Sequence, residues 1–161
     1  MKVRVKINLP LPRKGYPPER SYYASDLSNL VKIGVSLYGE KTYFRFKRNH
    51  QDLSLSYKDF GRMVDCVGTS FAELGLSDSA IAVIGETSPE WVITYLAAVN
   101  GGSMIVPLDK ELSKEESANC KRRANVRCVV HSSAFTKTFE ELEAELPDVK
   151  HFIKISKEFF P

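Results

Sequence analysis

The sequence predicts a three-layer α/β domain, in which helices cover both faces of a central, largely parallel sheet. Two observations favour this class. From residue 80 onward, short apolar runs alternate with segments of helical periodicity. Glycine, proline or a capping residue marks almost every boundary between them. A β-hairpin and an irregular N-terminal arm are expected before this region.

The clearest stretch, residues 81–109, is typical of a strand, turn, helix, turn, strand unit. Its first strand is a short apolar run, suited to burial on both faces, and Gly85 ends it. Ser88 is placed to cap a helix whose first residue is Pro89, where a missing N–H is tolerated. The helix is predicted by apolar residues at helical spacing, and the next strand begins near Met104 after a Gly-Gly pair. The helical residues are Trp91, Val92, Tyr95, Leu96 and Val99.

The N-terminal part divides into an arm and the start of the domain. Residues 1–25 combine an alternating basic and apolar strand at 2–9 with a proline-rich segment. The domain proper is expected over 26–161. Asp26 or Ser25 is expected to cap a helix reaching Tyr38, with one apolar side. That side consists of Leu27, Leu30, Val31 and Val35.

The remaining elements follow from pattern and capping signals. Strands at 42–48 and 53–57 predict a hairpin around the polar turn 49–52. Ser56-x-x-Asp59 and Ser113-x-x-Glu116 resemble capping boxes, and each opens a helix. The expected helices are 56–74, 88–100, 113–124 and 136–146, and the expected strands of the parallel sheet are 80–84, 103–107, 127–130 and 151–155.

Composition excludes several classes of protein. The net charge of +3 lacks the concentrated basic face of a nucleic-acid binder, and no run is long enough to span a bilayer. Six lysines and arginines crowd the first twenty residues, against one acid. A solvated strand and loop are favoured there over a phosphate-binding or membrane-surface patch, because no amphipathic helical pattern accompanies the charges.

The three cysteines are widely spaced and odd in number, which disfavours a disulfide framework or a zinc site. A reducing cytoplasm is therefore expected. Cys66, Cys120 and Cys128 are interpreted as small apolar packing residues.

No catalytic or metal-binding constellation is found. The chain has no Walker P-loop, no G-x-G-x-x-G, no G-x-S-x-G and no H-E-x-x-H. His131 follows an apolar strand, at a place where open α/β sheets bind ligands, but a strand-end histidine hydrogen-bonded to its loop is favoured. Thr87, Ser88 and Glu90 could attract an anion to a helix N-terminus, and ordinary capping is favoured there.

The string ETSPEWVITYLAAVNGGSMIVPLDKELSKEES resembles the N-terminal part of AMP-forming acyl-CoA synthetases, members of the adenylate-forming superfamily. Three further pieces agree in order: LSYKDF at 55–60, LGL at 74–76 before the strand at 80–84, and VRCVVHS at 126–132. The SPEW form looks more like the long-chain fatty acyl type than the acetyl type.

The resemblance implies a longer parent enzyme that makes an acyl-adenylate from a fatty acid and ATP with Mg²⁺, then passes the acyl group to CoA. The family's phosphate loop, adenine and ribose contacts and catalytic lysine are absent. The chain alone is therefore expected to be inactive and to bind no cofactor. The resemblance also implies that the CoA nucleotide touches the loops at 108–112 and 131–137, with Asp109 and Lys137 as the candidate CoA-side residues.

The residues leave two other interpretations open. One is an adenylation domain for another carboxylic or amino acid, and the other is a non-catalytic α/β binding module. The remainder of the synthetase chain is the expected partner. Without it, an uncovered packing face is expected to favour self-association.

Overall fold

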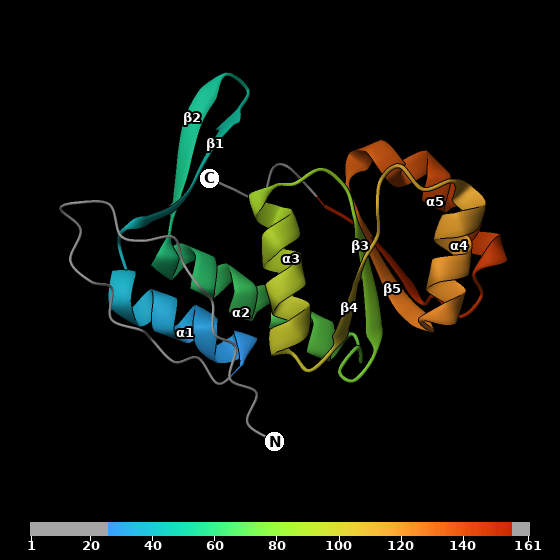
Figure 1. Ribbon diagram of the computed structural model, residues 1–161, viewed down its shortest axis with the longest axis horizontal. Coiled ribbons are helices and arrows are strands. Elements are labelled where there is room, and N and C mark those ends of the chain that lie inside the picture. Colours follow the sequence, from blue (N-terminus) through green and yellow to red (C-terminus); the bar gives the residue numbers. More distant parts are fainter. Residues whose placement is uncertain (1–25, 156–161) are drawn as a thin grey trace, which may run out of the picture.

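The computed structural model describes residues 26–155, so the expected strand at 2–9 and residues 156–161 lie outside it. A four-stranded parallel sheet carries helices on both faces, and a two-stranded antiparallel hairpin precedes it (Figure 1), which confirms the predicted class. The elements are α1 (Leu27–Tyr38), β1 (Thr42–Arg48), β2 (Gln51–Ser56), α2 (Tyr57–Glu73), β3 (Ala80–Ile84), α3 (Pro89–Asn100), β4 (Met104–Pro107), α4 (Lys114–Arg123), β5 (Val126–His131), η1 (Ser133–Phe135), α5 (Thr136–Leu142), η2 (Glu143–Glu145) and β6 (His151–Lys154).

The sheet has the strand order β4-β3-β5-β6, with all neighbours parallel. Every residue of the central strand β3 is buried, as its apolar run predicts. Because side chains alternate along a strand, β3 contributes to two cores. Ile81 and Val83 pack with α2 and α3, whereas Ala82 and Ile84 pack with α4 and α5.

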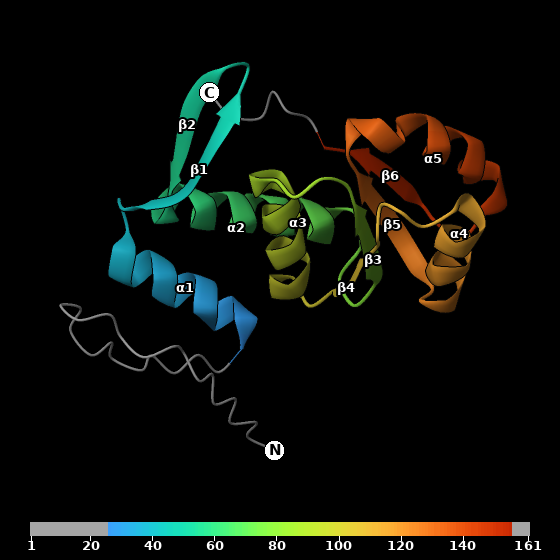
Figure 2. The same ribbon diagram turned by 45° about the horizontal axis from the view of Figure 1, so that its top comes forward.

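The helices form two layers on either side of the sheet. Figure 2 shows α1, α2 and α3 on one side and α4 with α5 on the other. In the second layer Ala118 of α4 and Phe139 and Leu142 of α5 are buried against the sheet. The hairpin projects beside the first layer, where Phe44 and Phe46 pack partly buried against its core.

The predicted capping residues are confirmed. The Ser56 hydroxyl accepts the Asp59 N–H at 3.1 Å, and the Ser88 hydroxyl accepts the Trp91 N–H at 3.2 Å. Ser113 and Glu116 form a complete capping box, with each side chain bonded to the other's backbone N–H. These hydrogen bonds join residues three positions apart, which explains why the helix starts are predictable from the sequence.

The hairpin turn is tighter than predicted. Gln51 already pairs with Arg48, so the turn consists of Asn49 and His50 alone and not of residues 49–52. Both residues have positive φ, 49° and 63°. This is the backbone that matches the twist of two-residue hairpins, and asparagine tolerates it.

The most buried face of α3 differs from the apolar spacing that predicts the helix. Ile93, Thr94, Ala97 and Ala98 are buried, whereas the larger apolar residues of α3 are half-buried. The small residues Ala97 and Ala98 lie on the side of α3 that packs against α2. A Cβ on Gly68 of α2 would lie 3.4 Å from the Ala97 carbonyl oxygen. Close helix packing therefore decides the orientation of α3.

Of the apolar side predicted for α1, only Val31 is buried, and Leu27 and Leu30 are exposed. The prediction that all three cysteines are packing residues is confirmed for the buried Cys128 and wrong for Cys66 and Cys120, which are exposed. The last helix is also shorter than predicted: α5 ends at Leu142 and a 3₁₀ turn follows, ahead of Pro147.

Candidate functional site

The carboxyl ends of the parallel strands form the candidate site, because open α/β sheets bind ligands at that edge. The loop after β3 begins at Gly85, and the loop after β4 begins at Leu108. The chain after β5 continues through Ser132 into η1 and α5. Since β3 lies between β4 and β5, the two sequence-predicted CoA-side loops flank the end of β3.

Asp109 lies exposed in the loop after β4, and its carboxylate is engaged locally. Its Oδ1 accepts the Glu111 N–H at 2.9 Å, and its carbonyl oxygen accepts the Leu112 N–H at 3.3 Å. These bonds fold the loop back on itself as an Asx turn. Asp109 therefore shapes the loop that carries it.

Lys137 is exposed in the first turn of α5, on the other side of β3. Within residues 26–155, no hydrogen bond or ion pair joins it to Asp109. The two loops are connected indirectly, because Lys114 of α4 forms an ion pair with Glu141 of α5. The fold thus places both predicted residues at the carboxyl edge without bringing them into contact.

A polar pocket of about 350 Å³, here called the strand-end pocket, lies between the hairpin and the end of β3. Its walls come from Arg48, the segment 86–90, Ser132 and neighbouring residues. The Ser132 hydroxyl oxygen is buried and has no hydrogen-bond partner within the described residues. Gly85 allows this approach, because a Cβ there would lie 2.8 Å from the Ser132 Cβ.

The start of α3 at this pocket is occupied by its own capping contacts. Ser88 caps the helix, and the largely buried Glu90 carboxylate forms an ion pair with Arg48 from the hairpin. The prediction of ordinary capping is confirmed. Sequence reasoning missed the partner of Glu90, because Arg48 precedes it by 42 residues and no local pattern links the two.

His131 is buried at the end of β5, and its Nδ1 lies 2.9 Å from the Ser132 carbonyl oxygen. Its ring packs 5.0 Å from the ring of Phe139. The favoured interpretation, a strand-end histidine bonded to its loop, is confirmed.

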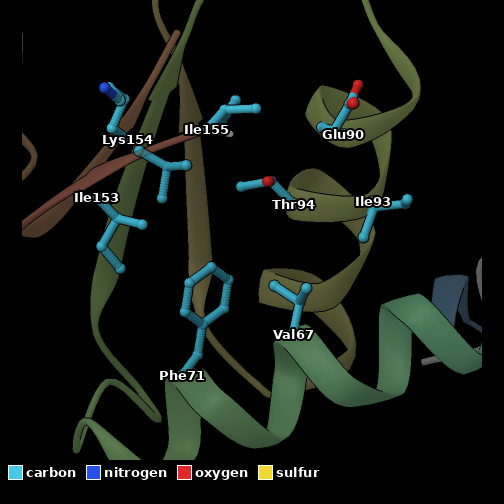
Figure 3. Close-up of a pocket in the computed structure, with 9 residues that line it drawn as sticks. Val67, Phe71, Glu90, Ile93, Thr94, Ile153, Lys154 and Ile155 are labelled. Atoms are coloured by element: carbon cyan, nitrogen blue, oxygen red, sulfur yellow. The ribbon is translucent and has the colours of Figure 1, made fainter. Parts of the chain in front are cut away.

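An apolar pocket of about 190 Å³ lies beside β6, between α2, α3 and the sheet. Figure 3 shows Phe71 of α2, Thr94 of α3 and Ile153 of β6 directed toward this space. Its lining is almost entirely apolar, apart from Thr94, Glu90 and Lys154. The apolar majority of these side chains offers hydrophobic contact to an occupant.

The described residues do not assemble a catalytic set. No group of three metal-ligating side chains occurs among residues 26–155. The lining of the strand-end pocket combines Lys47 and Arg48 with Glu86 and Glu90, and the N-terminus of α3 beside it is already capped by Ser88. In the same part of the chain, no helix is long and apolar enough to cross a membrane.

Comparison with known proteins agrees with this architecture. Residues 34–160 match the protein family described as AMP-binding enzyme. The chain is 29% identical over 129 residues to a long-chain-fatty-acid–CoA ligase, ACSBG2, of Gallus gallus, covering 77% of this chain and 17% of that protein. It is 24% identical over 115 residues to the ligase ACSBG1 of Homo sapiens, covering 71% of this chain and 15% of that protein.

Solved structures share the fold. The anthranilate CoA ligase AuaEII superposes with a TM-score of 0.71 at 18% identity, covering 85% of this chain and 26% of the ligase. A Mycobacterium tuberculosis fatty acyl CoA synthetase superposes with a TM-score of 0.73 at 13% identity, covering 81% of this chain and 26% of the synthetase. This chain spans less than a fifth of the curated relatives' length. The match over residues 34–160 shows that the chain belongs to the family of AMP-binding, adenylate-forming enzymes and corresponds to their N-terminal portion.

Proposed function

We propose that this chain is the N-terminal part of an AMP-forming ligase that activates a long-chain fatty acid with ATP and transfers the acyl group to CoA. The similarity to two long-chain-fatty-acid–CoA ligases over most of the chain carries this proposal. The solved structures include both an anthranilate ligase and a fatty acyl ligase at similar TM-scores. The fold alone therefore does not separate acid substrates.

The contribution of residues 26–155 to this activity is structural support and loop placement. When bound, ATP with Mg²⁺ would supply the adenylyl group that joins the carboxylate in the acyl-adenylate, with pyrophosphate as the leaving group. The strand-end pocket is not our candidate for that role, because Ser88 already caps α3 there and the Arg48 guanidinium is already paired with Glu90. In our proposal the nucleotide contacts and the catalytic lysine belong to the rest of the enzyme.

Lys137 is our proposed contact for a phosphate of CoA. Its ammonium group is exposed at the carboxyl edge of the sheet, where a point charge can meet a phosphate from solvent. Asp109 is proposed to hold the opposite loop in shape, through the bond from the Glu111 N–H. An acidic side chain at that place is better suited to shaping a loop than to contacting an anion.

The proposal as a whole is tested with the full-length protein encoded by the reading frame that contains this chain. We expect acyl-CoA formation that is fastest with long-chain fatty acids, compared with acetate, benzoate and amino acids. The 161-residue chain by itself should catalyse no ATP–pyrophosphate exchange. Exchange by this chain alone, or a preference for an amino acid, would contradict the proposal.

The CoA contact is tested by Lys137→Ala in the full enzyme. The Michaelis constant for CoA should rise about fivefold, because an exposed charge contact contributes about 1 kcal/mol. Lys150→Ala is the matched control, since Lys150 is exposed before β6 at the opposite, amino edge of the sheet. An unchanged Michaelis constant for CoA in the Lys137 variant would remove this residue from the site.

A further inference from the structure

The apolar pocket beside β6 lies on a half of the sheet that has a helix layer on one face only. On the α3 side, α3 packs over β3 and β4, and the described residues 26–155 provide no further helix over the carboxyl half of β5 and β6. On the opposite face, the centre of the Phe139 ring of α5 lies 6.0 Å from that of Phe152 of β6, and Val129 of β5 is fully buried. One face of these two strands is therefore packed, and the other face carries a groove.

Apolar side chains from α2, α3, β5 and the end of β6 line this pocket, here called the β6 groove. Figure 3 shows α3 along one wall, the strands along the other, and α2 across one end. Among these side chains Val67, Ile153 and Ile155 are only half-buried, so the groove offers apolar surface that the described residues leave uncovered. The apolar lining consists of Val67, Phe71, Ile93, Val130, Ile153 and Ile155.

A parallel sheet is normally covered by helices on both faces, because both faces of its strands are apolar. Strand β5 has this character, since Val129 packs with α4 and α5 whereas Val130 lines the groove. Strand β6 is also an edge strand, and its outer edge is unpaired within residues 26–155. A helix lying beside α3 would bury Ile153 and Ile155 and complete the layer. The β6 groove therefore fits the apolar side of one helix.

The relatives of this chain are several times longer than it. The chain covers 17% of the long-chain-fatty-acid–CoA ligase ACSBG2 and 26% of the ligase AuaEII. Strand β6 brings the chain to the groove, because the Ile155 N–H donates to the His131 carbonyl oxygen at 2.8 Å and Ile155 itself lines the groove. A helix attached to the chain through β6 would therefore be held near the groove at a high effective concentration.

We propose that a helix from the rest of the ligase chain packs its apolar side into the β6 groove and completes the helix layer over β5 and β6. This inference rests on the proposed function, which makes the chain a part of a longer enzyme. A second copy of the chain fits the groove less well. If that copy filled the groove with the exposed apolar side of its α1, the contact would be head-to-tail, and each added copy would present a new empty groove.

The test compares the full-length protein with the 161-residue chain, each carrying Ile153→Cys. A thiol reagent followed by peptide mass mapping measures the labelling rate at residue 153, which is half-buried in the groove. We expect labelling about tenfold slower in the full-length protein, because a covered thiol reacts only through local opening. Val149→Cys is the matched control, since Val149 is also half-buried but packs with the core on the α4 and α5 side. Its labelling rate should be the same in the two proteins.

Amide hydrogen exchange of β6 in the two unsubstituted proteins gives a second measurement that needs no variant, and exchange should be slower in the full-length protein. The inference is overturned by equal rates in both measurements, by equal slowing in the Val149 variant, or by protection of residue 153 that arises when the 161-residue chain dimerises. Acyl-CoA formation is assayed separately. Protection of residue 153 without ligase activity supports the inference and contradicts the proposed function, whereas ligase activity with equal labelling contradicts the inference alone.

Discussion

Replacing Lys121 with methionine should stabilise this domain at neutral pH. Lys121 lies on the inner side of α4 and is only 1% exposed. Its Nζ donates to the Ser117 hydroxyl at 2.5 Å and lies 4.6 Å from the centre of the Phe139 ring. Within residues 26–155 it takes part in no ion pair. A buried ammonium without a carboxylate is costly, because the apolar surroundings replace only part of its hydration.

The size of the effect follows from the pKa. Burial lowers the pKa of the Lys121 ammonium from 10.5 to about 8. A shift of that size means that folding destabilises the charged form of Lys121, relative to its neutral form, by about 3 kcal/mol. Since the folded pKa lies below the unfolded value, the unfolded chain holds the proton more tightly. The full cost is present below pH 8 and is lost as the pH rises from about 8 to 10.5.

Lys121→Met keeps an unbranched side chain of similar length and removes the charge. At pH 7 its free energy of unfolding should exceed that of the parent by about 2–3 kcal/mol, and the difference should shrink toward pH 10.5. Urea unfolding at several pH values, monitored by the fluorescence of Trp91, the one tryptophan in the chain, measures the stability difference and its dependence on pH. The exposed Lys150→Met should change the stability by less than about 0.5 kcal/mol. A destabilised Lys121 variant, or a gain independent of pH, would refute the reasoning.

Two further predictions concern the sheet. Gly85→Ala should lower the free energy of unfolding by about 1–3 kcal/mol, because its φ is 154° and a Cβ would meet the Ser132 Cβ at 2.8 Å. Gly68→Ala, in the interior of α2 with an ordinary 3.4 Å contact, should be neutral or slightly stabilising in the same urea assay. For the cysteines, a thiol reagent at pH 8 should label Cys66 and Cys120 in the native chain, and Cys128 only after denaturation. Burial raises the pKa of the Cys128 thiol to about 12. Rapid labelling of all three thiols without denaturant would contradict the burial of β5.

Features controlled by neighbouring residues were predictable from the sequence. Ser88 and Pro89 mark the start of α3, and the capping box at Ser113 marks the start of α4. A cap is made within three residues, so its signal is contained in a short window. The strand β3 was predictable for a similar reason, because a strand buried on both faces is a continuous apolar run.

Burial within helices was predicted less well. Leu30 and Cys66 are apolar residues at helical spacing, yet the structure exposes both. Conversely, Lys121 is charged and the structure buries it. Periodicity predicts which residues share one side of a helix, but the residues that cover that side come from distant parts of the chain.

The candidate site shows the same division. The sequence indicated that Asp109 and Lys137 follow strands, and the parallel sheet places both at its carboxyl edge. The ion pair of Glu90 with Arg48 and the burial of the Ser132 hydroxyl carry no sequence signal, since each depends on how separate loops meet.

By itself, the sequence determined the order of the elements, the class of the fold and the helix caps, all of which rest on local backbone preferences and hydrophobic periodicity. Only the tertiary structure decided which side of each helix is covered, because that depends on packing between residues far apart in the chain. The exposed leucines Leu27 and Leu30 of α1 and the buried amine of Lys121 both follow from that packing.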